Sequence, residues 1–118
     1  MENAKELVLA AAAALEEKKA FDIKIIEIGE LSPIADYFVI ADGSNDSQVE
    51  AMTDAVKEAA MKLGITERRI DGTTGSGWVL MDYNDVVIHI FHSDSRSFYN
   101  LERVWKDGKT VTAEDLRK

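Results

Sequence analysis

The residues of this chain that could carry nucleotide chemistry are Gly43 and Ser44, which stand between a predicted strand and a predicted helix. The first N–H groups of a helix lack intrahelical partners, so such a turn can bind an anion. Enzymes that transfer nucleotidyl groups place a Gly-Ser pair there, but they also need paired acids on a neighbouring strand to hold magnesium. The next predicted strand offers only Asp71, while Asp82 and Asp85 straddle a turn. The pattern therefore predicts a structural helix entry, with no bound metal and no catalytic residues.

The two histidines, His89 and His92, are the other candidates for chemistry. They are three residues apart, on and just beyond a predicted strand, so they point to opposite faces. A zinc site needs a third and a fourth ligand, and none is obvious in the sequence. Neither histidine belongs to a recognisable motif with a serine or cysteine nucleophile. We therefore expect His89 to be packed or hydrogen-bonded rather than catalytic, and we expect no cofactor.

A β-hairpin from Trp78 to Phe91 positions one of these histidines. Asn84-Asp85 lies between two β-rich runs and suits a tight two-residue turn, since both residue types tolerate positive φ. Side chains alternate along a strand, so this turn places one apolar set on one face and a mixed set on the other. The apolar face carries Val79, Met81, Tyr83, Val86, Ile88 and Ile90; the mixed face carries Trp78, Leu80, Asp82, Val87, His89 and Phe91.

The mixed face is typical of a partner-binding surface, because it joins large aromatic side chains to polar ones. Trp78 is either a core residue, as most tryptophans are, or part of that surface, because Asp82 and His89 do not suit a dry core. Tyr99 is flanked in a predicted helix by Arg96 and Arg103, a composition shared by interfaces and by solvated helix faces.

The remaining elements place the hairpin in a single compact α/β domain. The pattern predicts, in order, a helix, two strands, a helix, three strands and a helix, forming one mixed sheet of about five strands flanked by helices. The last helix is predicted to follow Ser93 or Ser95, with Phe98, Leu101 and Trp105 as its core stripe. The other predicted ranges are 2–20 for the first helix, 23–28 and 37–40 for the first two strands, 69–71 for the strand before the hairpin and 72–77 for a flexible connection.

The second helix has clear end signals. Ser47 with Glu50 three residues later fits a capping box, and Gly64 ends the helix. Beyond Gly108 the sequence is polar, so we expect an ordered core over residues 2–107 and a frayed tail over 108–118. The apolar stripe of the second helix is predicted to be Val49, Met52, Val56, Ala59 and Leu63.

Composition limits the classes of function. At 118 residues the chain is long enough for one hydrophobic core, and it has no apolar run that could span a membrane and no basic start typical of a signal peptide. The absence of cysteine excludes disulfides and thiolate metal sites and fits a cytoplasmic protein. The net charge of −8 disfavours nucleic-acid binding and favours a basic protein partner.

Several segments together carry a family resemblance. They are Ala35-Asp36-Tyr37-Phe38-Val39-Ile40 with Gly43-Ser44-Asn45, Asp71-Gly72, Trp78-Val-Leu-Met-Asp82, Asp85-Val-Val-Ile-His89-Ile-Phe91 and Arg96-Ser-Phe-Tyr99-Asn-Leu-Glu102. With these segments the chain resembles the ribosomal silencing factor family, also called the Iojap-like proteins, from about Ile23 to Trp105. The last two segments form a long and unusual stretch, so the resemblance is specific.

The resemblance implies a fold like that of nucleotidyl transferases but without their catalytic acids. It also implies binding to the large ribosomal subunit through the fourteenth large-subunit protein, which blocks joining of the small subunit and lowers translation when nutrients are scarce. The residues that it implies for this interface are Trp78, Leu80, Asp82, His89, Phe91, Arg96 and Tyr99.

Two positions depart from the family pattern. Gly77 stands where the family commonly has an acid before the tryptophan, which puts one polar contact in doubt. Asn84 replaces a usual glycine in the hairpin turn and suits the same conformation. The alternatives to a silencing factor are an assembly factor that uses the same docking face and a nucleotidyl transferase that uses Gly43 and Ser44. An exposed aromatic face also allows a homodimer when no ribosome is present.

Overall fold

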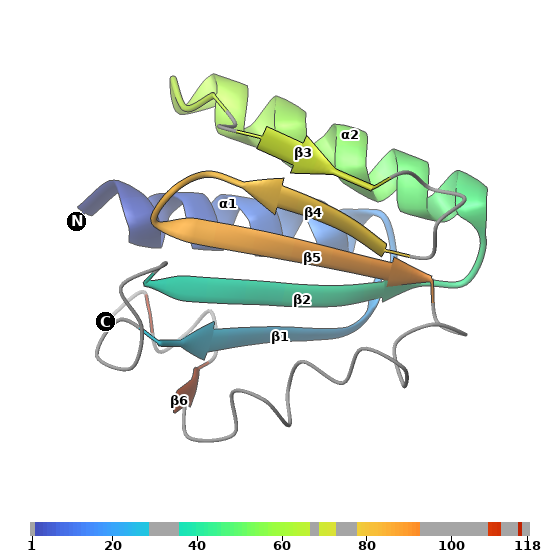
Figure 1. Cartoon of the computed structure of the whole chain (residues 1–118), viewed down its shortest axis with the longest axis horizontal. Coiled ribbons are helices and arrows are strands. Elements are labelled where there is room, and N and C mark those ends of the chain that lie inside the picture. The colour runs from blue at the N-terminus through green and yellow to red at the C-terminus, as the bar shows by residue number, and fades with distance from the viewer. Residues whose placement is uncertain are drawn as a thin grey trace.

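The computed structural model of the chain describes residues 2–28, 36–66, 69–72, 78–92, 109–111 and 116. Figure 1 shows two helices packed beside a twisted sheet. The predicted connection over 72–77, apart from Gly72, and the predicted last helix with Phe98, Leu101 and Trp105 lie outside the described residues. No helix within the described ranges is long and apolar enough to cross a membrane.

Six strands form one mixed sheet in the order β3-β4-β5-β2-β1-β6, which confirms the predicted α/β class. Only the central pair, β2 and β5, is parallel; every other neighbouring pair is antiparallel. The strands are β1 (Phe21–Glu27), β2 (Tyr37–Gly43), β3 (Arg69–Asp71), β4 (Trp78–Asp82), β5 (Val86–His92) and β6 (Lys109–Val111).

Strand β6 lies within the segment that the sequence predicted to be frayed. It pairs with β1 and forms one edge of the sheet, and its Val111 side chain is 6% exposed. Val111 lies opposite Ile25, whose side chain belongs to the same buried cluster. The segment therefore has an apolar side chain to bury against an open strand, which a count of its polar residues does not reveal.

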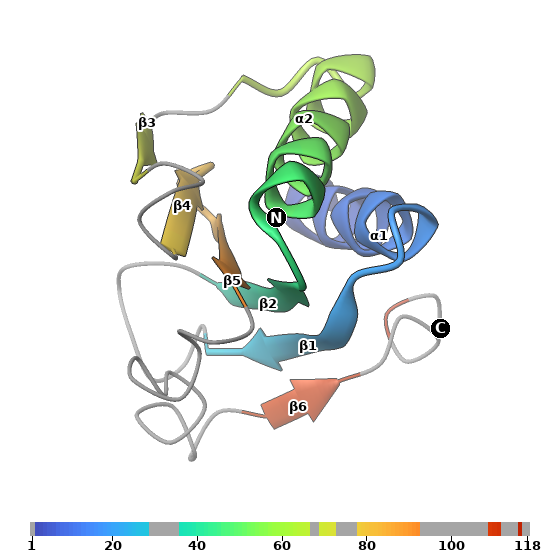
Figure 2. The ribbon, with the colours of Figure 1, turned by 90° about the vertical axis from the view of Figure 1, so that its right-hand side faces the viewer.

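Both described helices, α1 (Glu2–Glu17) and α2 (Asp46–Lys62), cover the same face of the sheet, as Figure 2 shows. The helical spacing of Leu7, Ala11, Leu15 and Lys18 predicts one side of the first helix. The first three are buried, whereas Lys18 is exposed and follows the end of α1. The helix ends three residues before the predicted Ala20, and Lys19 then adopts a positive φ of 63°. This turn brings the chain back antiparallel to the helix to start β1.

The apolar stripe of α2 is confirmed at Val49, Met52 and Val56 and corrected at its end. Ala60 is fully buried, whereas Ala59 is only partly buried and Leu63 is 39% exposed. At 100° per residue Ala60 lies about 20° from Val49 around the helix, whereas Ala59 lies about 80° away. Leu63 is the C-cap residue, one position beyond the end of the helix. Gly64 has a φ of +74° and ends the helix as predicted.

Apolar clusters lie on both faces of the sheet. One cluster joins the helices to the sheet and contains Ile25, Val39, Ile88 and Ile90, among others. The cluster on the opposite face consists of Ile26, Ile28, Phe38, Ile40, Val87 and Phe91, with Trp78 and Leu80 packed against it.

Candidate binding site on the hairpin

The hairpin has the register that the sequence predicted. Trp78 lies opposite Phe91, Leu80 opposite His89, and Asp82 opposite Val87. The predicted two-residue turn is present, with the Tyr83 N–H donating to the Val86 carbonyl at 2.9 Å. Within it only Asn84 has a positive φ, of 75°, and the Asp85 N–H donates to the Tyr83 carbonyl over 3.0 Å. This i to i+2 hydrogen bond closes a γ-turn centred on Asn84. Alternation along the two strands then sets the mixed face.

Three rings on the mixed face are stacked nearly parallel. The ring centroids of Trp78 and Phe91 are 5.6 Å apart with 17° between the planes, and those of Trp78 and His89 are 5.7 Å apart with 24°. Phe38 of β2 meets His89 edge-on at 4.8 Å and 70°. Aromatic pairs at these separations stabilise one another beyond their burial, so the hairpin carries an ordered aromatic layer, which we call the aromatic stack (Trp78, His89 and Phe91).

A hydrogen bond joins two members of the stack. The Trp78 Nε1–H donates to Nδ1 of His89 over 3.1 Å. An imidazole nitrogen that accepts a hydrogen bond carries no proton of its own, so neutral His89 has its proton on Nε2. Burial lowers the pKa of His89 from 6.5 to about 4, which keeps the ring neutral at physiological pH and keeps Nδ1 available as an acceptor.

The structure separates the predicted interface residues by burial. Phe91 and His89 are 1% and 3% exposed, so neither offers a surface to a partner in this conformation. Trp78, Leu80 and Asp82 are half-buried, and each has a part that reaches the surface. Arg96 and Tyr99 lie outside the described residues. The hairpin therefore presents β4 outwards and holds β5 beneath it as support.

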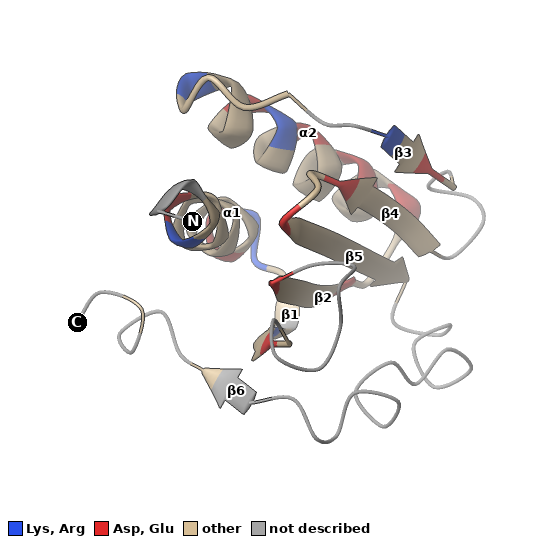
Figure 3. Cartoon of the chain, turned by 60° about the vertical axis from the view of Figure 1, so that its left-hand side comes forward, with Lys and Arg blue, Asp and Glu red and all other residues tan. Residues whose placement is uncertain are grey.

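The outward strand has polar neighbours. The Asp82 Oδ1 accepts from the N–H of Asn84 over 2.8 Å, which ties this carboxylate to the turn. On β3, Arg69 lies opposite Asp82, and its Nε pairs with Asp71 at 2.9 Å with both side chains more than half exposed. Figure 3 shows acidic residues at the ends of the strands while the strand centres carry none. The site is thus an apolar centre, formed by Trp78 and Leu80, with charged groups at its margin.

The Gly-Ser turn before α2 is occupied by the chain itself. The Gln48 Oε1 accepts from the Ser44 N–H at 2.6 Å and from the Ser44 hydroxyl at 2.8 Å. The other end of the same amide, Nε2, donates to the carbonyls of Lys18 and Lys19, each at 3.0 Å. Both donors of Ser44 are therefore already engaged, and Gln48 ties the end of α1 to the start of α2.

Sequence reasoning placed the helix cap two residues too late. Asn45 is the N-cap, with φ −155° and ψ 168°, and its side chain accepts from the Gln48 N–H at 2.8 Å. Asn45 followed by Gln48 has the same capping-box spacing as Ser47 followed by Glu50. The spacing of Asn45 and Gln48 in the sequence is therefore the signal that identifies Gln48 as a residue of the helix entry.

Gly43 has a packing role. A Cβ at this position would lie 2.8 Å from Val49 Cγ2 and 3.1 Å from Met52 Sδ, so only glycine lets the helix approach the strand this closely. Asp71, the acid that the sequence offered on the next predicted strand, lies on β3, three strands from β2, which corresponds to about 14 Å. Among the described residues, no three His, Asp or Glu side chains come together as metal ligands. The turn thus has a structural explanation for each of its distinctive residues.

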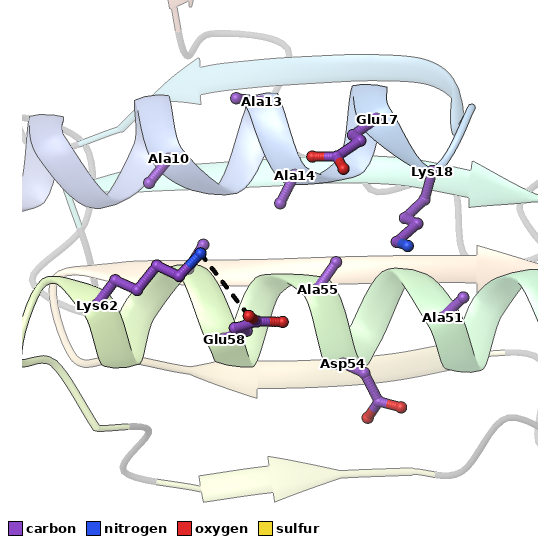
Figure 4. Close-up of a pocket in the computed structure, with 11 residues that line it drawn as sticks. Ala10, Ala13, Ala14, Glu17, Lys18, Ala51, Asp54, Ala55, Glu58 and Lys62 are labelled. Atoms are coloured by element: carbon purple, nitrogen blue, oxygen red, sulfur yellow. Dashed lines mark ion pairs between the residues drawn. The ribbon is translucent and has the colours of Figure 1, made fainter.

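A groove of about 510 Å³ lies between the two helices, and Figure 4 shows its lining. Alanines from both helices form its floor, and its described lining includes no serine, histidine or cysteine. Lys62 and Glu58 pair across one turn of α2 at 3.7 Å but are largely exposed, so this ion pair stabilises little. The groove follows from the close packing of two alanine-rich helices.

Comparisons with known proteins agree with this architecture. A family model described as "Ribosomal silencing factor during starvation" matches residues 1–118. The ribosomal silencing factor RsfS of Bacillus subtilis is 43% identical over 105 residues, which is 89% of each chain. A crystal structure of a protein from Bacillus halodurans superposes with a TM-score of 0.79 at 37% identity, covering 91% of this chain and 97% of that one. A mouse protein named "Mitochondrial assembly of ribosomal large subunit protein 1" is 28% identical over 77% of this chain and 41% of its own length.

Proposed function

Because the chain belongs to the ribosomal silencing factor family, we propose that it is a non-enzymatic inhibitor of translation that acts in the cytoplasm. It binds the large ribosomal subunit through the fourteenth large-subunit protein and sterically blocks joining of the small subunit when nutrients are scarce. Its chemistry is shape and charge complementarity, with no bond made or broken.

The observation that carries this proposal is the outward strand of the hairpin. Trp78 and Leu80 are half-buried apolar side chains on one strand, backed by Phe91 and His89. Aromatic anchors that are rigidly supported and bordered by polar groups contribute most to protein interfaces. A net charge of −8 favours a basic surface such as that of a ribosomal protein.

The docking residues divide by their part in binding. We assign direct contact to Trp78, Leu80 and Asp82, and we keep Arg96 and Tyr99 as further contacts on the resemblance alone. His89 and Phe91 act from beneath, because their side chains are buried.

An enzymatic function has less support. The Ser44 donors are bound to Gln48, and the candidate acid Asp71 lies three strands away. A nucleotidyl transferase would show magnesium-dependent binding of a nucleoside triphosphate in a calorimetric titration. We expect no heat of binding, whereas a titration that saturates and is lost in Ser44→Ala would support the enzyme.

A second candidate function is assistance in assembly of the large subunit. The name of the mouse relative favours it, and the same face would dock. The two functions differ in timing: an inhibitor binds mature large subunits, whereas an assembly factor binds only precursors.

Sucrose-gradient sedimentation tests the proposal. The purified protein should travel with mature large subunits, remain absent from small subunits and reduce the formation of joined ribosomes when both are mixed. Sedimentation with precursor particles but not with mature large subunits would favour the assembly function. Absence from both kinds of particle would contradict either function.

A further inference from the structure

We infer that His89 is a positioning residue: it does not touch the partner but holds the indole of Trp78 in one orientation, so that the partner meets the ring through its carbon atoms. This inference rests on the proposed function for its consequence in binding. Its structural part concerns the free protein alone and can be tested there.

Burying the imidazole of His89 costs free energy. His89 is 3% exposed, and no described residue hydrogen-bonds its Nε2. A buried polar atom without a partner destabilises the fold, whereas an apolar side chain would fill this volume without that cost. The gain that offsets the cost is the side-chain hydrogen bond between His89 and another described residue, from the Trp78 Nε1–H to Nδ1 of His89.

The ring of His89 is itself held in place by neighbouring aromatic rings. Phe38 meets it edge-on from β2, and Phe91 is nearly parallel to it with 9° between the ring planes. His89 lies beside Ile40 of β2 in the parallel register, so its backbone lies in β5, one of the two central strands. Its acceptor is consequently fixed relative to the core, and the Trp78 indole takes its orientation from that fixed point.

The orientation of Trp78 decides which of its atoms a partner contacts. Trp78 comes from β4, which is closer to the sheet edge, and the residue is only half-buried. With Nε1–H directed inwards to His89, the ring presents carbon atoms outwards beside Leu80, which shares its face. A partner that fits this surface supplies aliphatic or aromatic groups at this point rather than a hydrogen-bond acceptor for the indole.

The test begins with the free protein, by NMR of its two tryptophan indole N–H groups. The Trp78 signal, assigned by its loss in Trp78→Phe, should exchange slowly with solvent. In His89→Leu it should shift and exchange faster, because the acceptor is gone. In His89→Asn, whose side-chain oxygen can replace Nδ1, the slow exchange should return in part. A Trp78 signal that is equally protected in wild type and His89→Leu would overturn the inference.

Binding to large subunits provides the second readout. We expect His89→Leu to bind about fivefold more weakly than wild type, and His89→Asn to recover part of the loss. Ile88→Val is the matched control, since it truncates a buried side chain on the same strand but on the opposite face of the sheet, away from the acceptor and the docking residues. It should lower stability but leave the indole signal and the affinity unchanged.

The two failures can be distinguished. If wild-type protein does not bind large subunits, the proposed function fails while the NMR result still decides the role of His89. If wild type binds and His89→Leu binds equally well, the positioning role fails while the proposed function stands.

Discussion

The indole nitrogen of Trp78 and the Nδ1 of His89 are 3.1 Å apart on neighbouring strands of the hairpin. The two residues are diagonal neighbours, because Trp78 lies opposite Phe91 and His89 lies opposite Leu80. Diagonal pairs lie within reach of aromatic side chains, so the register itself produces this contact. One residue of the pair is buried and the other reaches the surface. The outer strand of the hairpin is thereby oriented by the inner one.

The stability of the protein should depend on pH through His89. Its pKa is about 4 in the folded state and 6.5 in an exposed chain, so between these values the unfolded state binds a proton that the folded state does not. As pH falls from 6.5 to 4, the free energy of unfolding should decrease by up to about 3 kcal/mol from this residue, and above 6.5 His89 should contribute no pH dependence.

Chemical denaturation at several pH values measures this effect. The same face also carries Asp42 and Asp82, so the informative quantity is the difference between wild type and His89→Leu. That difference should grow in favour of the variant below pH 6.5. Parallel curves for the two proteins would show that the folded state accepts the proton on His89 as readily as the unfolded state does.

Phe91→Ala should act on folding rather than directly on docking. Phe91 is 1% exposed and stacks on Trp78, so truncation leaves a cavity beneath the outer strand. We expect a loss of about 3–5 kcal/mol in the free energy of unfolding, measured by denaturant titration. A loss below about 1 kcal/mol would indicate a side chain that is accessible rather than buried.

Gln48→Ala should destabilise the protein without affecting its binding. The substitution removes four side-chain hydrogen bonds that connect the α2 entry to Ser44 and to the end of α1. We expect a loss of about 1–2 kcal/mol, since the bonds are solvent-accessible and each contributes little. Gln48→Glu keeps the acceptor for Ser44 but removes the donor to Lys18 and Lys19, so thermal melts of both variants separate the two ends of the amide.

Gly43→Ala should lower stability through a steric conflict. The added methyl group would lie 2.8 Å from Val49 Cγ2, on the rigid first turns of α2. Overpacking of this kind costs about 1–3 kcal/mol. Thermal melts would measure it, and an unchanged melting temperature would mean that the helix moves away from the strand without cost.

The sequence predicted the hairpin closely because its signals are local. Residues Val79 to Tyr83 and Val86 to Ile90 alternate with period two, and Asn84 accepts the positive φ that the turn needs. It also predicted the exact bounds of β3. Local pattern was insufficient at the α2 entry, because two overlapping capping boxes begin at Asn45 and Ser47 and only the packed structure selects between them.

Burial on the mixed face could not be predicted from alternation. Period two places His89 and Phe91 on the same face as Trp78 and Leu80, but it does not say what covers each strand of that face. Which of these side chains are buried depends on the strand order, since β5 is inside the sheet between β4 and β2. The same strand order also places Asp71 far from Ser44. That separation depends on the tertiary topology and not on the local sequence.

The docking face is tested most directly by sedimentation of Trp78→Ala with mature large subunits, alongside a thermal melt of the same protein. Met61→Ala is the matched control, because it removes an exposed apolar side chain on α2, in the helix layer away from the hairpin face. We predict that Trp78→Ala still folds but loses about 2 kcal/mol of binding free energy, or roughly thirtyfold in affinity, while Met61→Ala binds like wild type. A Trp78→Ala protein that melts normally and sediments with large subunits at wild-type strength would contradict this account.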